Sequence, residues 1–226
     1  MCGIFGIFSH EKVKFNDSLK SFGKQNSKRG PDGYGFVHLE NMFMGMYRLA
    51  IVGNENGGQP IFSEDKNVAI ICNGEIYNYK ELKNELSRDI KFTSTSDVEV
   101  ILKGYLLHGI DFFSRLSGMF ALAIFDKEKN ELIISRDRFG IKPLFIMESK
   151  KSLYFSSTIT SFQSLQCKIS DKNVIKQIIQ GYSIGKNTLL SDVQMLPQGE
   201  VHSYKLIEEK ISKKIKCKYS LAVLLP

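Results

Sequence analysis

A cysteine stands second in the chain, ahead of the apolar run GIFGIF at residues 3–8. A cysteine in this position is usually a small buried hydrophobe at the head of a strand. If Met1 is removed, Cys2 instead carries a thiol and a free α-amine, whose ordinary pKa values are about 8.5 and about 7.7–8.0. The amine can accept the thiol proton, so one residue supplies both nucleophile and base, as in threonine N-terminal hydrolases. This chemistry needs no histidine. The histidines form no recognisable arrangement with a cysteine: they are His10, His38, His108 and His202.

Further polar residues stand near the ends of predicted elements. Arg48 follows an apolar strand pattern, and its guanidinium suits bidentate binding of a carboxylate, although an arginine there is often only a surface charge. Asn73, Gly74 and Glu75 follow the next apolar run. They form either a plain tight turn or an oxyanion hole, in which an Asn amide and a Gly backbone N–H point at one oxygen. Asp97 lies in the first turn of a predicted helix, where the helix dipole favours a carboxylate in any case.

Composition excludes several classes of protein. The 226 residues include 31 Lys and Arg against 24 Asp and Glu, a formal charge of +7, but no dense basic face that would predict nucleic-acid binding. The cysteines, Cys2, Cys72, Cys167 and Cys217, lie too far apart for a zinc pair and are too few for a disulfide framework. We therefore expect a reducing, cytoplasmic setting and no metal. No signal peptide is evident, and no apolar run approaches the roughly 20 residues of a membrane helix.

The elements predicted from periodicity favour an α+β fold with largely antiparallel sheets. RGPDGYG at 29–35 predicts a turn. Helix starts are predicted at Asn78 and at Ser96, where Glu99 completes a capping box, and His108-Gly109 ends the second helix. After residue 181 we expect irregular chain. Strands are predicted over 3–8, 34–38, 42–47, 68–72, 119–125, 131–135, 143–147 and 152–157, and further helices over 13–28 and 171–180.

Together these motifs resemble the glutaminase domain of the asparagine synthetase group of class II glutamine amidotransferases, whose nucleophile is an N-terminal cysteine. The triplet in NGEIYN, rather than an HNG-type triplet, points to this group. The matching segments occur in family order: MCGIFGIF (1–8), RGPDGYG (29–35), RLAIV (48–52), GGQPIF (57–62), NGEIYNY (73–79), TSTSDVEVIL (93–102), LSGMFALAIFD (116–126), RDRFGIKPLF (136–145), LYFSS (153–157) and GYSIGKNTLLSDVQMLPQGE (181–200).

The resemblance implies a four-layer αββα N-terminal nucleophile hydrolase sandwich and a role for each matching residue. Cys2 would be the nucleophile and its α-amine the base, with Asn73 and Gly74 as the oxyanion hole. L-glutamine would be held at its α-carboxylate by Arg48 and at its α-ammonium by Glu75 and Asp97. The binding segment also includes Leu49, Ala50, Ile51 and Val52, and Arg29 and Asp32 flank the site. The loop 53–58 is either a lid or a plain flexible turn; family members often carry Asp where Gly53 stands.

We expect three parts: a glutaminase core over 1–165, a closing helix and exit segment over 166–200, and a basic and apolar tail or linker over 201–226. The SGG-x-D-S loop of the family's synthetase domain does not occur in the sequence. We therefore expect no ATP, Mg²⁺ or other cofactor in this chain, and a synthetase domain or subunit as partner. A homodimer is possible.

The sequence is compatible with three functions. The first is a glutaminase that supplies ammonia to an asparagine-synthetase-like amidation. The second is a non-catalytic domain that binds or regulates a synthetase partner. The third is an N-terminal-cysteine hydrolase of another amide. The ammonia acceptor is also open, with aspartate or a sugar acid as candidates.

Overall fold

The computed structural model describes the chain except for residues 51–57, 184, 209 and 219–226. Two six-stranded sheets form its centre, and every strand pairing in them is antiparallel. The first sheet has the order β10 (Val193–Met195), β8 (Phe145–Glu148), β9 (Ser152–Ser156), β1 (Gly3–Ser9), β3 (Met42–Arg48) and β2 (Gly33–His38). The second has the order β12 (Lys210–Lys218), β11 (Glu200–Ile207), β7 (Glu131–Arg136), β6 (Gly118–Asp126), β5 (Val68–Ile76) and β4 (Ile61–Phe62).

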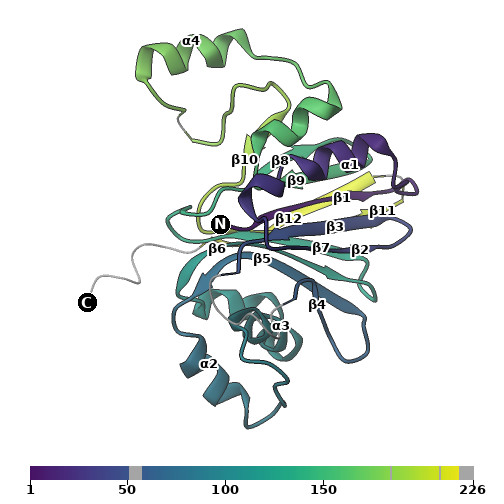
Figure 1. Cartoon of the computed structure of the whole chain (residues 1–226), viewed down its shortest axis with the longest axis vertical. Helices are drawn as coiled ribbons and strands as arrows, with labels where there is room; N and C mark the ends of the chain where they lie inside the picture. Colours follow the sequence, from purple (N-terminus) through teal and green to yellow (C-terminus); the bar gives the residue numbers. More distant parts are fainter. Residues whose placement is uncertain (51–57, 184, 209, 219–226) are drawn as a thin grey trace.

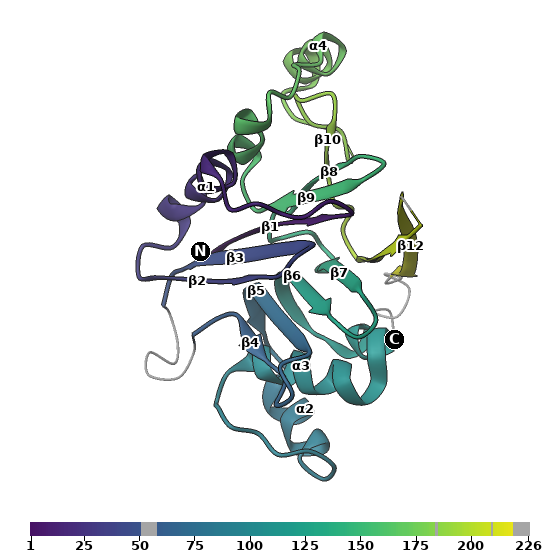
Figure 2. The ribbon, with the colours of Figure 1, turned by 90° about the vertical axis from the view of Figure 1, so that its right-hand side faces the viewer.

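Helices cover the outer faces of the two sheets. Figure 1 and Figure 2 show α1 (Asp17–Lys24) against the first sheet, and α2 (Tyr79–Leu86) and α3 (Asp97–His108) against the second. Helix α4 (Asp171–Gln180) projects away from these layers and has no buried residue. No described helix is long and apolar enough to cross a membrane. The layer order is therefore αββα, as predicted.

Three apolar clusters correspond to the three interfaces between layers. In β1, Ile4 and Phe8 pack between the sheets, while Phe5 packs on the opposite face with α1. In β5, Ile71 packs between the sheets and Ile70 packs towards the helices. Because successive side chains of a strand point to opposite faces, a strand buried on both faces reads as a continuous apolar run. This explains why these strands were predictable from the sequence.

Helix ends follow most of the predicted signals. Ser96 caps α3, since its Oγ accepts from the Val98 backbone N–H at 3.2 Å. The capping-box prediction for Glu99 is wrong, because its carboxylate accepts from the backbone N–H groups of Thr93 at 2.8 Å and Ser94 at 2.7 Å. Gly109, at φ +64°, ends α3 as predicted. The predicted helix over 13–28 is shorter, because it begins only where Asn16 caps α1, and a separate 3₁₀ turn follows at Ser27–Arg29.

The irregular chain expected after residue 181 is contradicted from Val193 onward by β10, β11 and β12. Strand β11 pairs with β7, and β12 pairs with β11. The buried polar residues His202 and Ser203 hid the strand pattern of β11. In β12 the Lys-rich sequence KISKKIKCK is typical of an edge strand that is protected from further pairing. The hairpin thus extends the second sheet, while the division of the chain at residues 165 and 200 stays a prediction.

Candidate active site

A cavity of about 360 Å³ opens where strand ends of both sheets lie side by side. Strands β1 and β3 are antiparallel, with Gly3 opposite Tyr47, so the start of one lies beside the end of the other. Residues at the end of β5 and at the start of α3 also line the cavity. The predicted site residues that line the cavity are Cys2, Arg48, Leu49, Asn73, Gly74, Glu75 and Asp97.

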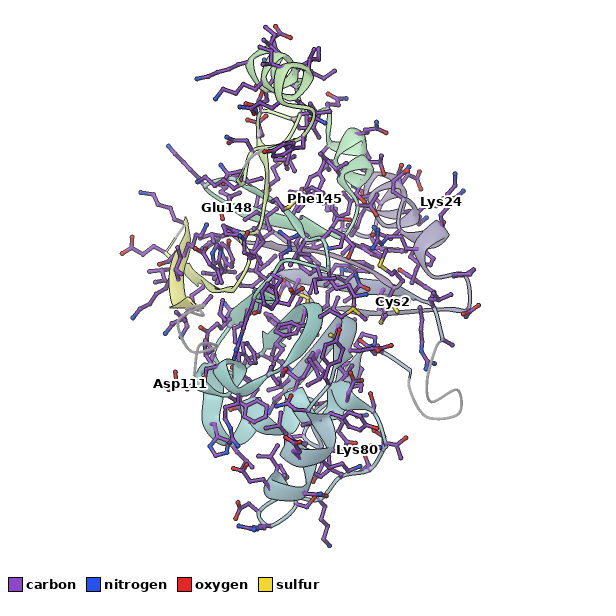
Figure 3. All side chains as sticks on the ribbon, turned by 90° about the vertical axis from the view of Figure 1, so that its left-hand side faces the viewer. Cys2, Lys24, Lys80, Asp111, Phe145 and Glu148 are labelled. Atoms are coloured by element: carbon purple, nitrogen blue, oxygen red, sulfur yellow. The ribbon has the colours of Figure 1, made fainter. Side chains whose placement is uncertain are left out.

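Cys2 lies directly before β1, and Figure 3 shows it at the height where the two sheets meet. The Leu49 backbone N–H donates to Cys2 Sγ at 3.4 Å, and Arg29 Nε donates to the Cys2 carbonyl oxygen at 3.1 Å. Behind it, the Ile4 backbone N–H donates to Ser157 Oγ at 3.1 Å. These contacts fix both the thiol and the start of the strand that carries it.

The other described cysteine side chains are poorly suited to act as nucleophiles. Burial raises the pKa of the Cys72 thiol well above its ordinary value, and the neighbouring Asp97 carboxylate raises it further. Burial also raises the pKa of Cys167, which lies outside the cavity with its Sγ 3.4 Å from Met147 Sδ. A thiol that stays protonated is a weak nucleophile. Cys2 is therefore the candidate nucleophile among the described cysteines.

The segment Asn73-Gly74-Glu75 is part of β5, so the tight turn considered for it is wrong. Asn73 pairs with Ala121 and Gly74 with Phe120, and the strand continues to Ile76. Polar residues that end an apolar run suggested a turn, but pairing with β6 keeps the backbone extended. Asn73 is 1% exposed, and its Nδ2 has no hydrogen-bond partner among the described residues. A buried donor left unpaired costs about 1–3 kcal/mol, so it calls for a functional explanation.

Gly74 lies on a stretch of the β5 edge that has no strand partner among the described residues. In an antiparallel sheet, every second residue directs its N–H and C=O to the same side. On the β4 side of β5, Ile70 pairs with β4, the Cys72 N–H donates to Gln59 Oε1 at 2.6 Å, and the Ile76 N–H donates to Asp97 Oδ2 at 2.8 Å. Gly74 lies between the last two, so its N–H faces this edge, where it lines the cavity.

Only glycine fits at position 74. A Cβ added to Gly74 would lie 2.2 Å from the Met119 carbonyl oxygen on β6. The strands therefore approach closely here because the residue has no side chain. The buried amide of Asn73 and the N–H of Gly74 are two donors at neighbouring positions of one strand, and both residues line the cavity. An oxyanion hole needs two such donors aimed at one oxygen.

A guanidinium and two carboxylates line the cavity together with Cys2, and the ammonium of Lys142 lines it as well. Arg48 ends β3, Glu75 is half-buried near the end of β5, and Asp97 opens α3. Burial raises the pKa of the Asp97 carboxyl, and the nearby Glu75 charge raises it further. Such a set of charges is complementary to a free amino acid, which carries one carboxylate and one ammonium.

Asp97→Asn is expected to bind an amino-acid substrate more weakly while folding at least as stably at neutral pH. The amide oxygen can still accept from Ile76, but the charge that the ammonium would meet is lost, so KM should rise roughly 10- to 100-fold. A raised carboxyl pKa means that ionised Asp97 destabilises the fold at neutral pH, and this cost disappears as the pH falls through the raised pKa and below 3.8. Thermal midpoints of both proteins from pH 7 to pH 3 test this: the advantage of Asp97→Asn should shrink on acidification, and an advantage that grows would contradict it.

The remaining predicted site residues lie in part outside the cavity and in part outside the described residues. Arg29 and Asp32 do not line the cavity but hold its parts together: besides the bond of Arg29 to Cys2, Asp32 Oδ2 accepts from the Ala50 backbone N–H at 2.8 Å. Leu49 lines the cavity, whereas Ala50 does not. Ile51, Val52 and most of the loop 53–58 lie outside the described residues. All the roles assigned to these residues stay predictions.

The structure adds residues that the sequence did not single out. Gln59 and Lys142 both line the cavity, and the Lys142 side chain is largely buried. Both belong to segments that match the family, GGQPIF and RDRFGIKPLF, but no local pattern indicates that they reach the cavity. Within the described part of the chain, no group of three or more His, Cys, Asp or Glu side chains could hold a metal ion.

Comparison with known families gives a match to a profile described as a glutamine amidotransferase domain, over residues 1–216. The chain belongs to this family. The match includes β11 and most of β12, the hairpin that extends the second sheet.

Curated relatives of this amidotransferase domain are glutamine-hydrolysing asparagine synthetases. The chain is 39% identical over 187 residues to asparagine synthetase 1 of Bacillus subtilis (strain 168), covering 80% of this chain and 29% of that protein. It is 42% identical over 168 residues to asparagine synthetase 2 of the same organism, covering 73% and 22%. For asparagine synthetase B of Escherichia coli (strain K12) the identity is 36% over 160 residues, covering 70% and 29%. The chain thus spans less than a third of the length of these relatives.

Solved structures confirm the predicted fold. The glutamine phosphoribosylpyrophosphate amidotransferase of B. subtilis superposes with a TM-score of 0.68 over 97% of this chain and 50% of its own, at 19% sequence identity. A structure described as the allosteric regulatory enzyme of purine biosynthesis gives the same TM-score at 20% identity, covering 97% of this chain and 49% of its own. The amidotransferase domain therefore shares the αββα arrangement of these structures.

Proposed function

We propose that the chain hydrolyses L-glutamine to L-glutamate and ammonia in the cavity headed by Cys2. The proposal is carried by the combination of groups in one cavity: the Cys2 thiol, the buried amide of Asn73, the N–H of Gly74, and the charged side chains of Arg48, Glu75 and Asp97. Membership of the glutamine amidotransferase domain family supports the same substrate. Arg48 binds the α-carboxylate through its planar guanidinium, and Glu75 and Asp97 bind the α-ammonium. The side-chain amide of glutamine then extends towards Cys2.

The first half-reaction forms a thioester. Met1 lines the cavity and is 53% exposed, and its removal gives Cys2 a free α-amine. The amine takes the thiol proton as Sγ bonds to the amide carbon, and the carbonyl oxygen becomes an oxyanion held by Asn73 Nδ2 and Gly74 N–H. When the oxyanion collapses, the C–N bond breaks, the nitrogen takes the proton back from the amine, and ammonia leaves.

The second half-reaction consumes water. The α-amine, now neutral, accepts a proton from a water molecule as the water oxygen bonds to the thioester carbon. The same donors hold the second oxyanion, the C–S bond breaks, and the proton returns to Sγ. One glutamine and one water thus yield one glutamate and one ammonia, with Cys2 regenerated.

The ammonia is used, in this proposal, by an asparagine-synthetase-like amidation in a synthetase domain or subunit. The names of the curated relatives and the fraction of their length that this chain spans support such a partner. ATP and Mg²⁺ belong to that partner and not to the cavity described above. A cytoplasmic location and a possible homodimer are further parts of the proposal. Acceptor specificity is tested by adding aspartate or a sugar acid to the chain combined with such a synthetase and identifying the amide formed.

Glutamate release from glutamine by the purified chain tests the activity, with asparagine and simple amides as competing substrates. The proposal expects glutamine to be the preferred substrate. Release from another amide at a higher kcat/KM would favour a different N-terminal-cysteine hydrolase. No release at all from a chain whose intact mass proves that Met1 is gone would favour a non-catalytic binding domain.

Arg48→Met is expected to raise KM for glutamine roughly 100-fold with a smaller change in kcat, because a charge-assisted bidentate bond to the carboxylate is lost. The KM of Arg48→Lys should lie between those of the wild type and Arg48→Met, since an ammonium cannot reproduce the two-pronged geometry of the guanidinium. Arg88→Met is a matched control, because Arg88 is exposed and does not line the cavity. Steady-state kinetics test this set; an unchanged KM in Arg48→Met would contradict the assignment.

A further inference from the structure

The edge of β5 next to the cavity lacks a strand partner among the described residues. Strand β4 begins at Ile61, which pairs with Ile70, so β4 ends its contact with β5 before the cavity is reached. Two residues further along β5, the side chain of Gln59 takes the place of a strand. The Cys72 N–H donates to Gln59 Oε1 at 2.6 Å, and Gln59 Nε2 donates to the Cys72 carbonyl oxygen at 3.3 Å.

This pair of bonds reproduces a strand pairing with a single side chain. Both polar groups of the Cys72 backbone are satisfied, so the edge stays extended without a neighbouring strand. The next outward-facing N–H belongs to Gly74, and the one after that, at Ile76, is held by Asp97. The Gly74 N–H therefore lies between two backbone N–H groups that side chains bind, and no described residue occupies it, so a ligand in the cavity can accept from it.

The backbone of Gln59 is in close contact with β2, on the side away from β5. A Cβ added to Gly35 on β2 would lie 1.9 Å from the Gln59 carbonyl oxygen. The backbone at Gln59 thus packs against β2 of the first sheet while its side chain binds β5 of the second. Gln59 links the two sheets at the cavity wall, and its position depends on the absence of a side chain at position 35.

We propose that Gln59 is a positioning residue that sets the direction of the Gly74 N–H, and so aligns the oxyanion hole, through its two hydrogen bonds to Cys72. The proposal rests on the glutaminase function proposed above. Gln59 acts on the tetrahedral intermediate and not on the ground state, because Arg48, Glu75 and Asp97 bind the opposite end of glutamine. A displacement of about 1 Å at a reacting centre is enough to cost about 100-fold in rate.

Gln59→Met removes both hydrogen bonds and keeps the length of the side chain. We expect kcat for glutamine to fall about 10- to 100-fold, with KM within about threefold of wild type. The inhibition constant of glutamate γ-semialdehyde, whose aldehyde carbon becomes tetrahedral on Cys2, should rise in parallel with the loss of kcat. The inhibition constant of the product L-glutamate should stay near that of wild type. Gln163→Met, at an exposed glutamine outside the cavity, is the control and should match wild type.

Wild-type values of kcat and of aldehyde inhibition in Gln59→Met would overturn the assignment, as would an equal weakening of aldehyde and glutamate binding. A wild-type chain that releases no glutamate would refute the glutaminase function instead, so the two failures are distinguishable.

A pair of glycine variants tests the positioning role of Gln59 without changing Gln59 itself. These variants decide whether Gln59 has this role if Gln59→Met does not fold. Gly35→Ala must displace the Gln59 backbone, whereas Gly33→Ala on the same strand meets only ordinary contact, with Arg48 Cβ at 3.9 Å. Gly35→Ala should therefore lower kcat and aldehyde affinity together, and Gly33→Ala should not. Equal rates in the two variants, or failure of both to retain activity, would contradict the role of Gln59.

Discussion

Cys2→Ala is expected to lower kcat for glutamine hydrolysis by roughly 10⁴- to 10⁶-fold, the scale at which a nucleophile acts together with its base and oxyanion donors. The other described cysteines are poor replacements, because burial raises the pKa of the Cys72 and Cys167 thiols and Cys167 lies outside the cavity. The charges that bind the α-carboxylate and the α-ammonium remain in the variant. Glutamine should therefore still bind to Cys2→Ala, which calorimetry measures separately from glutamate release.

Cys167→Ala is the matched control for the loss of a thiol. Its Sγ contacts Met147 outside the cavity, so the variant should keep the wild-type rate. Intact mass must accompany the assay, because retained Met1 would block the α-amine and inactivate the wild-type chain as well. Glutamate release by Cys2→Ala at the wild-type rate would rule out the proposed mechanism.

Asn73→Ala is expected to lower kcat about 10²- to 10³-fold, which is the usual cost of removing one oxyanion-hole donor. The same substitution should leave the free energy of unfolding within about 1 kcal/mol of wild type, because the buried Nδ2 that it removes has no described partner in the unliganded fold. Kinetics and denaturant unfolding of one preparation test both statements. A fully active Asn73→Ala, or one that is strongly destabilised, would contradict them.

Asn26→Ala provides the contrast for stability, since both asparagines are buried. Asn26 Nδ2 donates to Ser156 Oγ at 3.0 Å and to Ser161 Oγ at 3.1 Å. Its removal leaves these buried hydroxyls with fewer partners, so it should cost about 1–3 kcal/mol of unfolding free energy. The comparison separates an amide retained for folding from one retained for a ligand. Similar stability losses in the two variants would contradict that distinction.

Most of the layered fold was predictable because its strands are buried on both faces. The runs at 68–72 and 119–125 are apolar throughout, the run at 131–135 is apolar at its three central residues, and each is found inside the second sheet. The hairpin β11–β12 was missed for the opposite reason. In β11, Ser203 is buried against Glu131 and Tyr204 donates to Glu148 at 2.6 Å, so polar side chains occupy interior positions that periodicity assigns to apolar ones.

The capping of α3 illustrates the limit of local motifs. Ser96 caps the helix as its sequence position predicts, because that bond joins residues two positions apart. Glu99 has the right type and spacing for the reciprocal bond, yet its carboxylate binds the loop at Thr93 and Ser94. These bonds join residues five and six positions apart, a spacing that the capping-box rule does not include.

The sequence by itself determined which residue types the site contains. A second-position cysteine, the Asn-Gly-Glu triplet, an arginine after a strand and an aspartate at a helix start are recognisable because each motif is contiguous in the chain. Only the tertiary structure decided that the triplet continues a strand, that the Gly74 N–H lies on an edge with no strand partner among the described residues, and that Gln59 and Asp97 bind the backbone on either side of it. Which groups of a strand stay unpaired depends on where its neighbour begins and on side chains that arrive from distant segments. Residue type and local spacing do not carry that information.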